Sequence, residues 1–432
     1  MSRPFLVLCQ GDSIQLDHMR KESLHLSQRS HTRLRHRGFF LCIVALWLSL
    51  SASLAAQHAL PLASDPTVRE AYQHFYVLDY PACIRLLKQV QSAHPGDPAA
   101  TTVLLEAEVF AELYRQDLLD TTFYANDGFL TGKHPTPEDP AVRDRIVSLE
   151  EQVEHEAAAR LSRNPRDVDA LYARGWARSL RAAYMAMVQR SFSPAFHLAL
   201  SAHSDEAKVL QIDPSYTDAK LVVGTYQYVI GALPWAFKFF FGFAGITGSK
   251  SRGMEMLHDA YYHAPMTSIE AGTVITLFLR REAKYQEAVG VVRQLKAKYP
   301  HDFLFCLEEA NLRKDAGEGM AAVAAYQDLL KQAAQPGYFP SSHLELAYFG
   351  MGEALRGQRH FADAAQAYER AATDPSSGVE LKRRSFVSAG KARDLIGDRQ
   401  HALQDYQAAI AIGSDTTQGD IARRYLKSPY HE

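Results

Sequence analysis

The feature that most constrains this chain is a repeat in its C-terminal third. Four residues recur there with spacings of 12, 4 and 3 positions, 38 residues apart: Gly352, Ala364, Tyr368 and Ala371, then Gly390, Ala402, Tyr406 and Ala409. The same frame fits two upstream stretches: Ala310, Ala322, Tyr326 and Leu329, and Thr276, Ala288, Val292 and Leu295. Small residues at these positions allow two helix axes to approach closely, while Tyr or Val fills the gap beside them. One such hairpin cannot bury its own apolar face, so the spacing predicts a stack of helix pairs.

This spacing resembles the tetratricopeptide (TPR) repeat, which has a period of about 34 residues. Ala283, Gly317 and Gly397 would then lie in the turns between paired helices. The resemblance implies an all-α, TPR-type α-solenoid over residues 57–428, with about eight antiparallel helix pairs. We expect irregular repeats to about residue 265, regular repeats over about 269–413, and a capping helix over about 418–428. Pro165 and Pro214 should end two second helices.

Two long insertions interrupt the expected repeats, at 121–140 and 233–250. The second overlaps a strongly apolar stretch, residues 226–248. Six aromatic residues crowd into nine positions there: Trp235, Phe237, Phe239, Phe240, Phe241 and Phe243. One interpretation is a segment folded back into the core. The other is an exposed patch or pocket that binds a partner, a lipid or a membrane surface.

The same stretch resembles a second, narrower family. Its sequence ALPWAFKFFFGFAGITGSKSRGMEMLHDA is similar to a signature of the eukaryotic TPR family that includes the inclusion-body clearance protein. The matching residues are Leu233, Pro234, Gly242, Phe243, Gly245, Gly253, Leu257 and Ala260. The resemblance covers about residues 165–330 and implies a non-enzymatic TPR protein linked to membranes or to the handling of other proteins. An export signal departs from that family's pattern.

The export signal is predicted within residues 33–57, RLRHRGFFLCIVALWLSLSASLAAQ. Three arginines precede an apolar run from Phe39 to Leu50, and small residues follow, which is the order of a secretory signal. We therefore expect residues 1–56 to be an N-terminal extension plus signal peptide, cut after Ala55 or Ala56. Residues 39–56 carry no charge, so an uncleaved inner-membrane anchor is the alternative. Whether translation starts at Met1 or Met19 stays open.

Charge and cysteine content fit an exported protein. The chain has 47 basic and 49 acidic residues; residues 1–56 contain seven and three of them, which leaves 40 basic and 46 acidic. A net charge near −6 argues against nucleic acid as a partner. Of the four cysteines, Cys83 and Cys306 would remain, at positions where a helix buries small apolar groups. We expect inert thiols in an oxidising periplasm.

The sequence contains no recognisable catalytic motif. Residues 128–134, GFLTGKH, are one residue short of a phosphate-binding loop and lack its metal-binding hydroxyl. Neither a zincin helix nor a nucleophile elbow is present. We therefore expect a protein that is not an enzyme and has no cofactor, catalytic residue or metal site, and an unrecognised enzyme is the third hypothesis.

A candidate binding surface follows from the repeat frame. TPR arrays usually bind extended peptides along the groove lined by their first helices, and five residues are expected to project there: Arg280, Asn311, Lys314, Arg356 and Lys391. Four of them are cationic, which would suit a carboxylate from an acidic segment or a peptide C-terminus. The alternative is that they are ordinary cations on exposed helix faces.

Together these observations predict an exported TPR binding or scaffold protein of a Gram-negative cell envelope. It would engage a protein or peptide partner through its concave groove and through the Phe-rich insertion. The alternative is a periplasmic component of a transport system that binds a small molecule or lipid, with the Phe-rich segment as a pocket wall. A closed apolar cavity of several hundred Å³ beside Phe240 would favour the alternative, and an open groove would favour the peptide.

Overall fold

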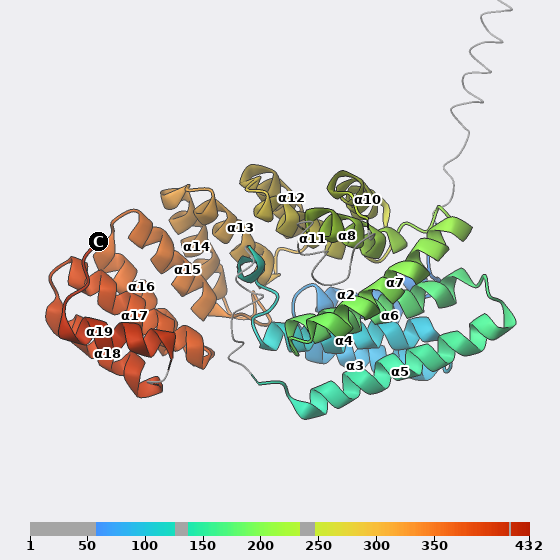
Figure 1. The fold of residues 1–432 in the computed structure, drawn as a ribbon, viewed down its shortest axis with the longest axis horizontal. Helices are drawn as coiled ribbons and strands as arrows, with labels where there is room; N and C mark the ends of the chain where they lie inside the picture. Colours follow the sequence, from blue (N-terminus) through green and yellow to red (C-terminus); the bar gives the residue numbers. More distant parts are fainter. Residues whose placement is uncertain (1–57, 126–136, 234–246, 414–415) are drawn as a thin grey trace, which may run out of the picture. The chain divides into compact units, whose positions relative to one another are not determined.

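The computed structural model describes residues 58–125, 137–233, 247–413 and 416–432, and residues 58–432 form one compact unit. The described residues form 17 α-helices and two 3-10 helices, and no strand occurs among them (Figure 1). The elements, in chain order, are η1 (Pro61–Ser64), α2 (Pro66–Phe75), α3 (Tyr80–Ala93), α4 (Pro98–Arg115), η2 (Thr121–Tyr124), α5 (Pro140–Arg163), α6 (Val168–Met187), α7 (Phe192–Ile212), α8 (Ala219–Ala232), α10 (Lys250–His263), α11 (Ser268–Arg281), α12 (Tyr285–Lys298), α13 (Phe303–Asp315), α14 (Gly319–Ala333), α15 (Leu344–Gly357), α16 (Phe361–Thr373), α17 (Val379–Leu395), α18 (Arg399–Ile412) and α19 (Thr417–Lys427).

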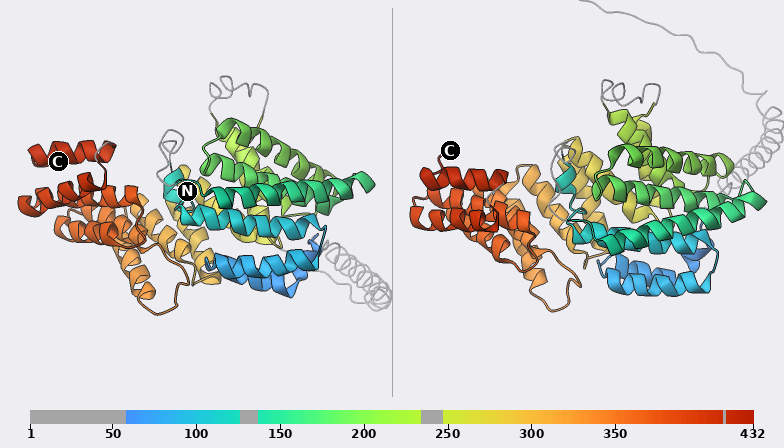
Figure 2. Two further views of the ribbon diagram at one scale, coloured as in Figure 1. Left: turned by 90° about the horizontal axis from the view of Figure 1, so that it is seen from below. Right: turned by 60° about the horizontal axis from the view of Figure 1, so that its bottom comes forward.

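Consecutive helices pack as hairpins, and each hairpin stacks on the next (Figure 2). The eight pairs are α2/α3, α4/α5, α6/α7, α8/α10, α11/α12, α13/α14, α15/α16 and α17/α18. The last helix, α19, packs against α18 and α17. The predicted all-α solenoid of about eight pairs is confirmed in the part of the chain that the structure describes.

Short sequence signals set many helix boundaries. Asp65, Asp97 and Asp139 each precede a proline, and each carboxylate accepts a hydrogen bond from a backbone N–H in the first turn of α2, α4 or α5. An acidic N-cap followed by proline is a favoured helix start, because the cap satisfies an unpaired N–H and proline has none to satisfy. Helix α5 ends at Arg163 and α7 at Ile212, directly before the residues that precede Pro165 and Pro214, as predicted.

The small residues of the repeat lie between helices, as the frame requires. Ala364 and Ala402 are completely buried. A Cβ atom added to Gly352 would lie 2.7 Å from the ring of Tyr368, and one added to Gly390 would lie 2.6 Å from the ring of Tyr406. A larger side chain at these sites would push the paired helices apart.

The turns between paired helices share one backbone conformation. Ala283, Gly317 and Gly397 have φ values of 56°, 77° and 81°, in the left-handed region, as expected for a tight turn. Each lies seven positions after the small residue of its first helix. Arg359, with a φ of 63°, occupies the same position in the repeat of Gly352. The hairpin geometry therefore forces the left-handed conformation even on a residue that disfavours it.

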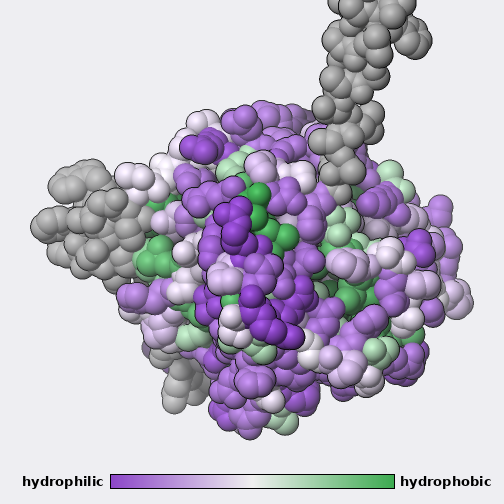
Figure 3. Space-filling view, turned by 90° about the vertical axis from the view of Figure 1, so that its right-hand side faces the viewer, coloured by the Kyte–Doolittle hydropathy of each residue, from purple (hydrophilic) through white to green (hydrophobic). Residues whose placement is uncertain are grey.

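Two further findings concern the core and the surface. Cys83 and Cys306 are buried, which confirms that they are core residues, and burial raises the pKa of each thiol to about 12. Among the described helices, none is both long and apolar enough to cross a membrane. The face shown in Figure 3 is mostly hydrophilic, with apolar residues in narrow strips between hydrophilic ridges.

Candidate partner-binding face

The first helices of the regular repeats, α11, α13, α15 and α17, form what we call the first-helix face. Their partners α12, α14, α16 and α18 are the second helices of each pair. The sequence analysis placed its candidate binding residues on the first helices. The structure divides the face into two parts with different surroundings, one at α11 and α13 and the other at α15 and α17.

The part at α11 and α13 is covered by the chain's own residues 117–124, which we call the docking segment. This segment follows α4 and contains η2, which packs against α11 and reaches α13 through Thr121. Thr121 Oγ1 accepts a hydrogen bond from Arg280 Nη1 at 2.6 Å and donates one to Glu308 Oε1 at 2.7 Å. The backbone oxygen of Tyr124 accepts from Arg281 Nη1 at 2.8 Å.

Arg280 is buried and neutralised by acidic residues of α13. It is 2% exposed, and its guanidinium lies 3.2 Å from Glu308 Oε2 and 3.4 Å from Asp315 Oδ2. Asn311 is also buried; it accepts a hydrogen bond from Tyr326 and donates to Asp120 Oδ1 at 3.4 Å. The expectation that Arg280 and Asn311 project into an open groove is therefore corrected, because the docking segment covers both.

The other three predicted residues are partly exposed. Lys314 pairs with Asp315 at 2.6 Å, and Arg356 lies 3.3 Å from Glu353. Lys391 Nζ lies over the rings of Tyr425 and Tyr430, 5.5 and 5.4 Å from their centroids. Their role in binding a partner stays a prediction.

Two cations in the part of the face at α15 and α17, Lys391 and Arg384, differ from Arg356 in forming no ion pair with a described carboxylate. Burial and the nearby Arg356 lower the pKa of Lys391. Arg384, which the sequence analysis did not select, is exposed and lies 4.7 Å from the ring centroid of Phe349. Glu353 opposes the lowering of the Lys391 pKa, although it forms no ion pair with Lys391 within 4 Å. Positive charge and the partly buried ring of Phe349 therefore lie together here.

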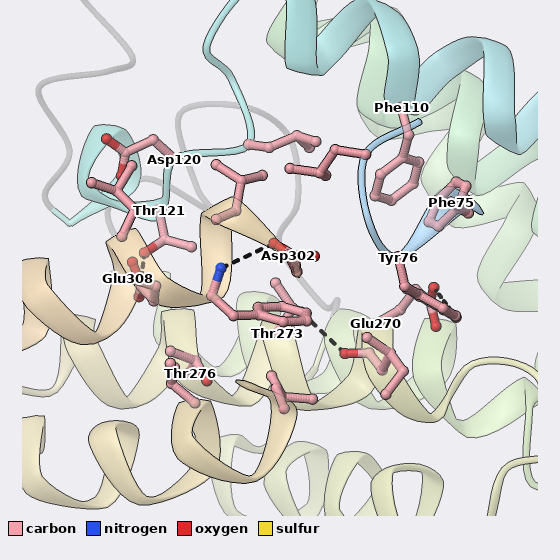
Figure 4. A pocket seen from close by; sticks show the side chains of 18 of the residues that line it. Phe75, Tyr76, Phe110, Asp120, Thr121, Glu270, Thr273, Thr276, Asp302 and Glu308 are labelled. Atoms are coloured by element: carbon pink, nitrogen blue, oxygen red, sulfur yellow. Dashed lines mark hydrogen bonds between the residues drawn. The ribbon is translucent and has the colours of Figure 1, made fainter. Parts of the chain in front are cut away.

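A cavity of about 160 Å³ lies between the N-terminal hairpins and helices α11 to α13. Aromatic residues Phe75, Tyr76 and Phe110 form one wall, and Figure 4 shows Thr121 and Glu308 at the opposite end. The volume is below that of a typical drug-sized ligand pocket. Phe240 lies outside the described residues, so the test that would distinguish a small-molecule cavity from a peptide groove stays open.

Buried carboxyl groups line this cavity. Tyr76 donates a hydrogen bond to Glu270 at 2.7 Å, and burial raises the pKa of Glu270 to about 7. Asp302 caps α13 by accepting from the Phe305 N–H at 3.1 Å, and burial raises its pKa to about 7. The Tyr76–Glu270 hydrogen bond links α2 to α11, and burial desolvates both carboxyl groups.

A second contact joins the docking segment to α15. His343, the residue before α15, lies 2.5 Å from Asp117 Oδ1 and 3.2 Å from Glu345 Oε1 through its Nδ1 atom. Burial disfavours a charged ring, but the two carboxylates together raise the pKa of His343 to about 9. Sequence reasoning missed this cluster because Asp117 and His343 are 226 positions apart.

The predicted Phe-rich patch cannot be placed. Trp235, Phe237, Phe239, Phe240, Phe241 and Phe243 all lie outside the described residues. The flanking helices α8 and α10 pack very closely, since a Cβ atom added to Gly253 would lie 2.6 Å from the Gly224 oxygen. Leu257 and Ala260 are buried. Core and exposed interpretations of the aromatic segment therefore both remain predictions.

The architecture is that of a tetratricopeptide-repeat solenoid. No family model and no curated protein matches the chain. Solved structures that are similar include yeast Tom70, at 12% identity and a TM-score of 0.33 over 95% of this chain and 96% of that one. The APC/C hetero-tetramer Cut9-Hcn1 matches at 12% identity and a TM-score of 0.38, over 85% of this chain and 65% of that one. The human IFIT1 dimer with m7Gppp-AAAA matches at 10% identity and a TM-score of 0.39, over 84% of this chain and 80% of that one. At these values the likenesses carry no argument on function, and the fold rests on the repeat geometry above.

Proposed function

We propose that this protein is a non-enzymatic TPR binding protein that engages a protein or peptide partner through α15 and α17. The observation that carries this proposal is the contrast in charge pairing along the first-helix face. Arg280 is neutralised by Glu308 and Asp315, whereas Arg384 and Lys391 have no acidic partner among the described residues. Cations that the fold does not neutralise are available to a ligand.

The chemistry of this surface favours a carboxylate from an acidic segment or a peptide C-terminus. The pKa of Lys391 is lowered by burial and by Arg356, so a bound carboxylate would relieve an unfavourable environment. Phe349, next to Arg384, would contact an apolar side chain of the same peptide. The net charge near −6 of residues 57–432 supports a protein partner over nucleic acid.

The test uses charge reversal with a matched control. Arg384→Glu with Lys391→Glu should abolish capture of specific partners from envelope extracts and should weaken binding of an acidic peptide from such a partner at least tenfold. Lys331→Glu, on an exposed part of second helix α14, reverses one positive charge away from this face and should leave binding intact. Mass spectrometry identifies the partners, and fluorescence anisotropy measures the peptide affinity. Equal binding by both variants would refute the assignment of this face.

We also propose that the protein is exported to the periplasm. The support is the order of residues 33–57, in which arginines, an apolar run and small residues follow one another. N-terminal sequencing of the protein from a periplasmic fraction should begin at Ala56 or Gln57. Recovery of the intact chain in the inner membrane would instead support the anchor formed by residues 39–56.

A further inference from the structure

Asp117, His343 and Glu345 bring three atoms of metal-binding types to one point. Asp117 lies in the docking segment, while His343 and Glu345 lie at the start of α15. Their facing atoms, Asp117 Oδ1, His343 Nδ1 and Glu345 Oε1, are all within 4.8 Å of one another. Two segments far apart in the sequence therefore supply an imidazole nitrogen and two carboxylate oxygens to the same small volume.

These three atoms are buried, and they do not satisfy one another's hydrogen-bonding capacity. The Glu345 side chain is 0% exposed and that of His343 is 17% exposed. None of the three facing atoms takes part in a hydrogen bond of acceptable geometry. A proton on His343 Nδ1 can point to only one oxygen at a time, so one buried carboxylate oxygen is left without a donor. A buried acceptor without a partner is costly, and a cation at the centre would satisfy all three atoms together.

Neighbouring groups hold the three side chains in place. Ser376 Oγ donates a hydrogen bond to Glu345 Oε2 at 2.6 Å, so the second oxygen of that carboxylate is already fixed. The His343 ring packs against the ring of Tyr114 with centroids 4.4 Å apart. Outer contacts of this kind orient the ligands of metal sites.

We propose that Asp117, His343 and Glu345 bind one divalent transition-metal ion, with Zn²⁺ as the best match to their donors. Zn²⁺ accepts imidazole nitrogen and carboxylate oxygen, whereas Mg²⁺ and Ca²⁺ favour oxygen alone. Two carboxylates neutralise its charge. Tetrahedral ligands at about 2.0–2.2 Å from Zn²⁺ are separated by about 3.3–3.6 Å. The 3.2 Å between His343 Nδ1 and Glu345 Oε1 is close to this separation. The 2.5 Å between His343 Nδ1 and Asp117 Oδ1 would lengthen by about 1 Å when the ion binds.

The bound ion would link the docking segment to the start of α15, because its ligands come from both. Asp117 is the first residue of the docking segment, which covers Arg280 and Asn311. Metal binding would therefore hold the docking segment in place where the covered part of the first-helix face meets the part at α15. This inference is independent of the proposed partner. Its site uses none of the residues assigned to partner binding.

The test is titration of the EDTA-treated, tag-free full chain with Zn²⁺. Calorimetry should give one ion per chain with a Kd of about 1 µM or tighter, and Tm should rise by about 3–6 °C at a hundredfold excess over Kd. Asp117→Asn, which keeps the side-chain size, and His343→Ala should each weaken binding by at least about 100-fold. His301→Ala removes an exposed histidine elsewhere and should change neither value. X-ray absorption of the Zn²⁺ complex should show one imidazole and oxygen ligands.

Several outcomes would overturn the proposal. One is the lack of saturable Zn²⁺ binding by the wild type. Another is wild-type affinity in Asp117→Asn, in which the fold is checked by circular dichroism. A loss of stability in His343→Ala with no effect of Zn²⁺ on the wild type would show a proton-bridged ion pair only. Binding of Mg²⁺ or Ca²⁺ in preference to Zn²⁺ would also contradict the assignment.

Discussion

The two parts of the first-helix face are built from the same repeat but present different chemistry. At α11 and α13, the docking segment covers the face and Arg280 is enclosed by Glu308, Asp315 and Thr121. At α15 and α17, Arg384 is exposed and Lys391 contacts tyrosine rings without an acidic partner among the described residues. The comparison shows that a cation at a repeat position acquires its role from what lies across the face, and the repeat frame alone does not assign it.

The largest expected effect comes from removing the buried cation. Arg280→Ala should lower the free energy of unfolding by about 3–5 kcal/mol, because Glu308 and Asp315 would lose their partner in a buried site. Arg384→Ala, on the exposed part, should change it by less than about 0.5 kcal/mol. Urea denaturation followed by circular dichroism measures both. Similar losses in the two variants would remove the distinction between the two parts of the face.

A matched pair of substitutions tests whether the difference between the two parts of the face is confined to the first helices and absent from the second helices. Ala322 in α14 and Ala364 in α16 hold equivalent repeat positions, and both are completely buried. Ala322→Leu and Ala364→Leu should each overpack a helix contact and lower stability by about 1–3 kcal/mol. Thermal and urea unfolding provide the measurement. An unchanged melting curve in either variant would count against the repeat frame in that region.

The smallest expected effect on stability comes from Asp302, a buried carboxyl group at the start of α13. Burial raises the pKa of Asp302 from 3.8 to about 7, so the folded state binds more protons than the unfolded state between these values. Stability should therefore fall as pH rises from about 4 to about 7 and then level off. Asp302→Asn keeps a capping side chain without the charge and should raise stability at pH 8 by about 1–2 kcal/mol.

The control for this prediction separates the charge from the cap. Asp302→Ala also removes the acceptor for the Phe305 N–H at the start of α13, which costs about 1 kcal/mol. It should therefore be less stable than Asp302→Asn at every pH. If Asp302→Asn showed the same pH dependence as the wild type between pH 4 and 7, Asp302 would not be the group responsible.

The sequence alone determined the repeat and much of its local geometry. The cadence of Gly352, Ala364 and Tyr368 fixes where paired helices touch, and the prolines after α5 and α7 fix where helices end, because these effects depend on residues close together in the chain. Even the turn positions were predictable at Gly317 and Gly397.

Only the tertiary structure decided which first-helix residues are covered. Thr121 contacts Arg280 from 159 positions away and Glu308 from 187 positions away, and Asp117 contacts His343 from 226. Local periodicity contains no information on such pairs, since it records the face on which a residue lies and not what packs against that face. Arg280 and Lys391 therefore look alike in sequence. They differ because the stacking of hairpins brings Glu308 and Asp315 of α13, together with the docking segment, against Arg280.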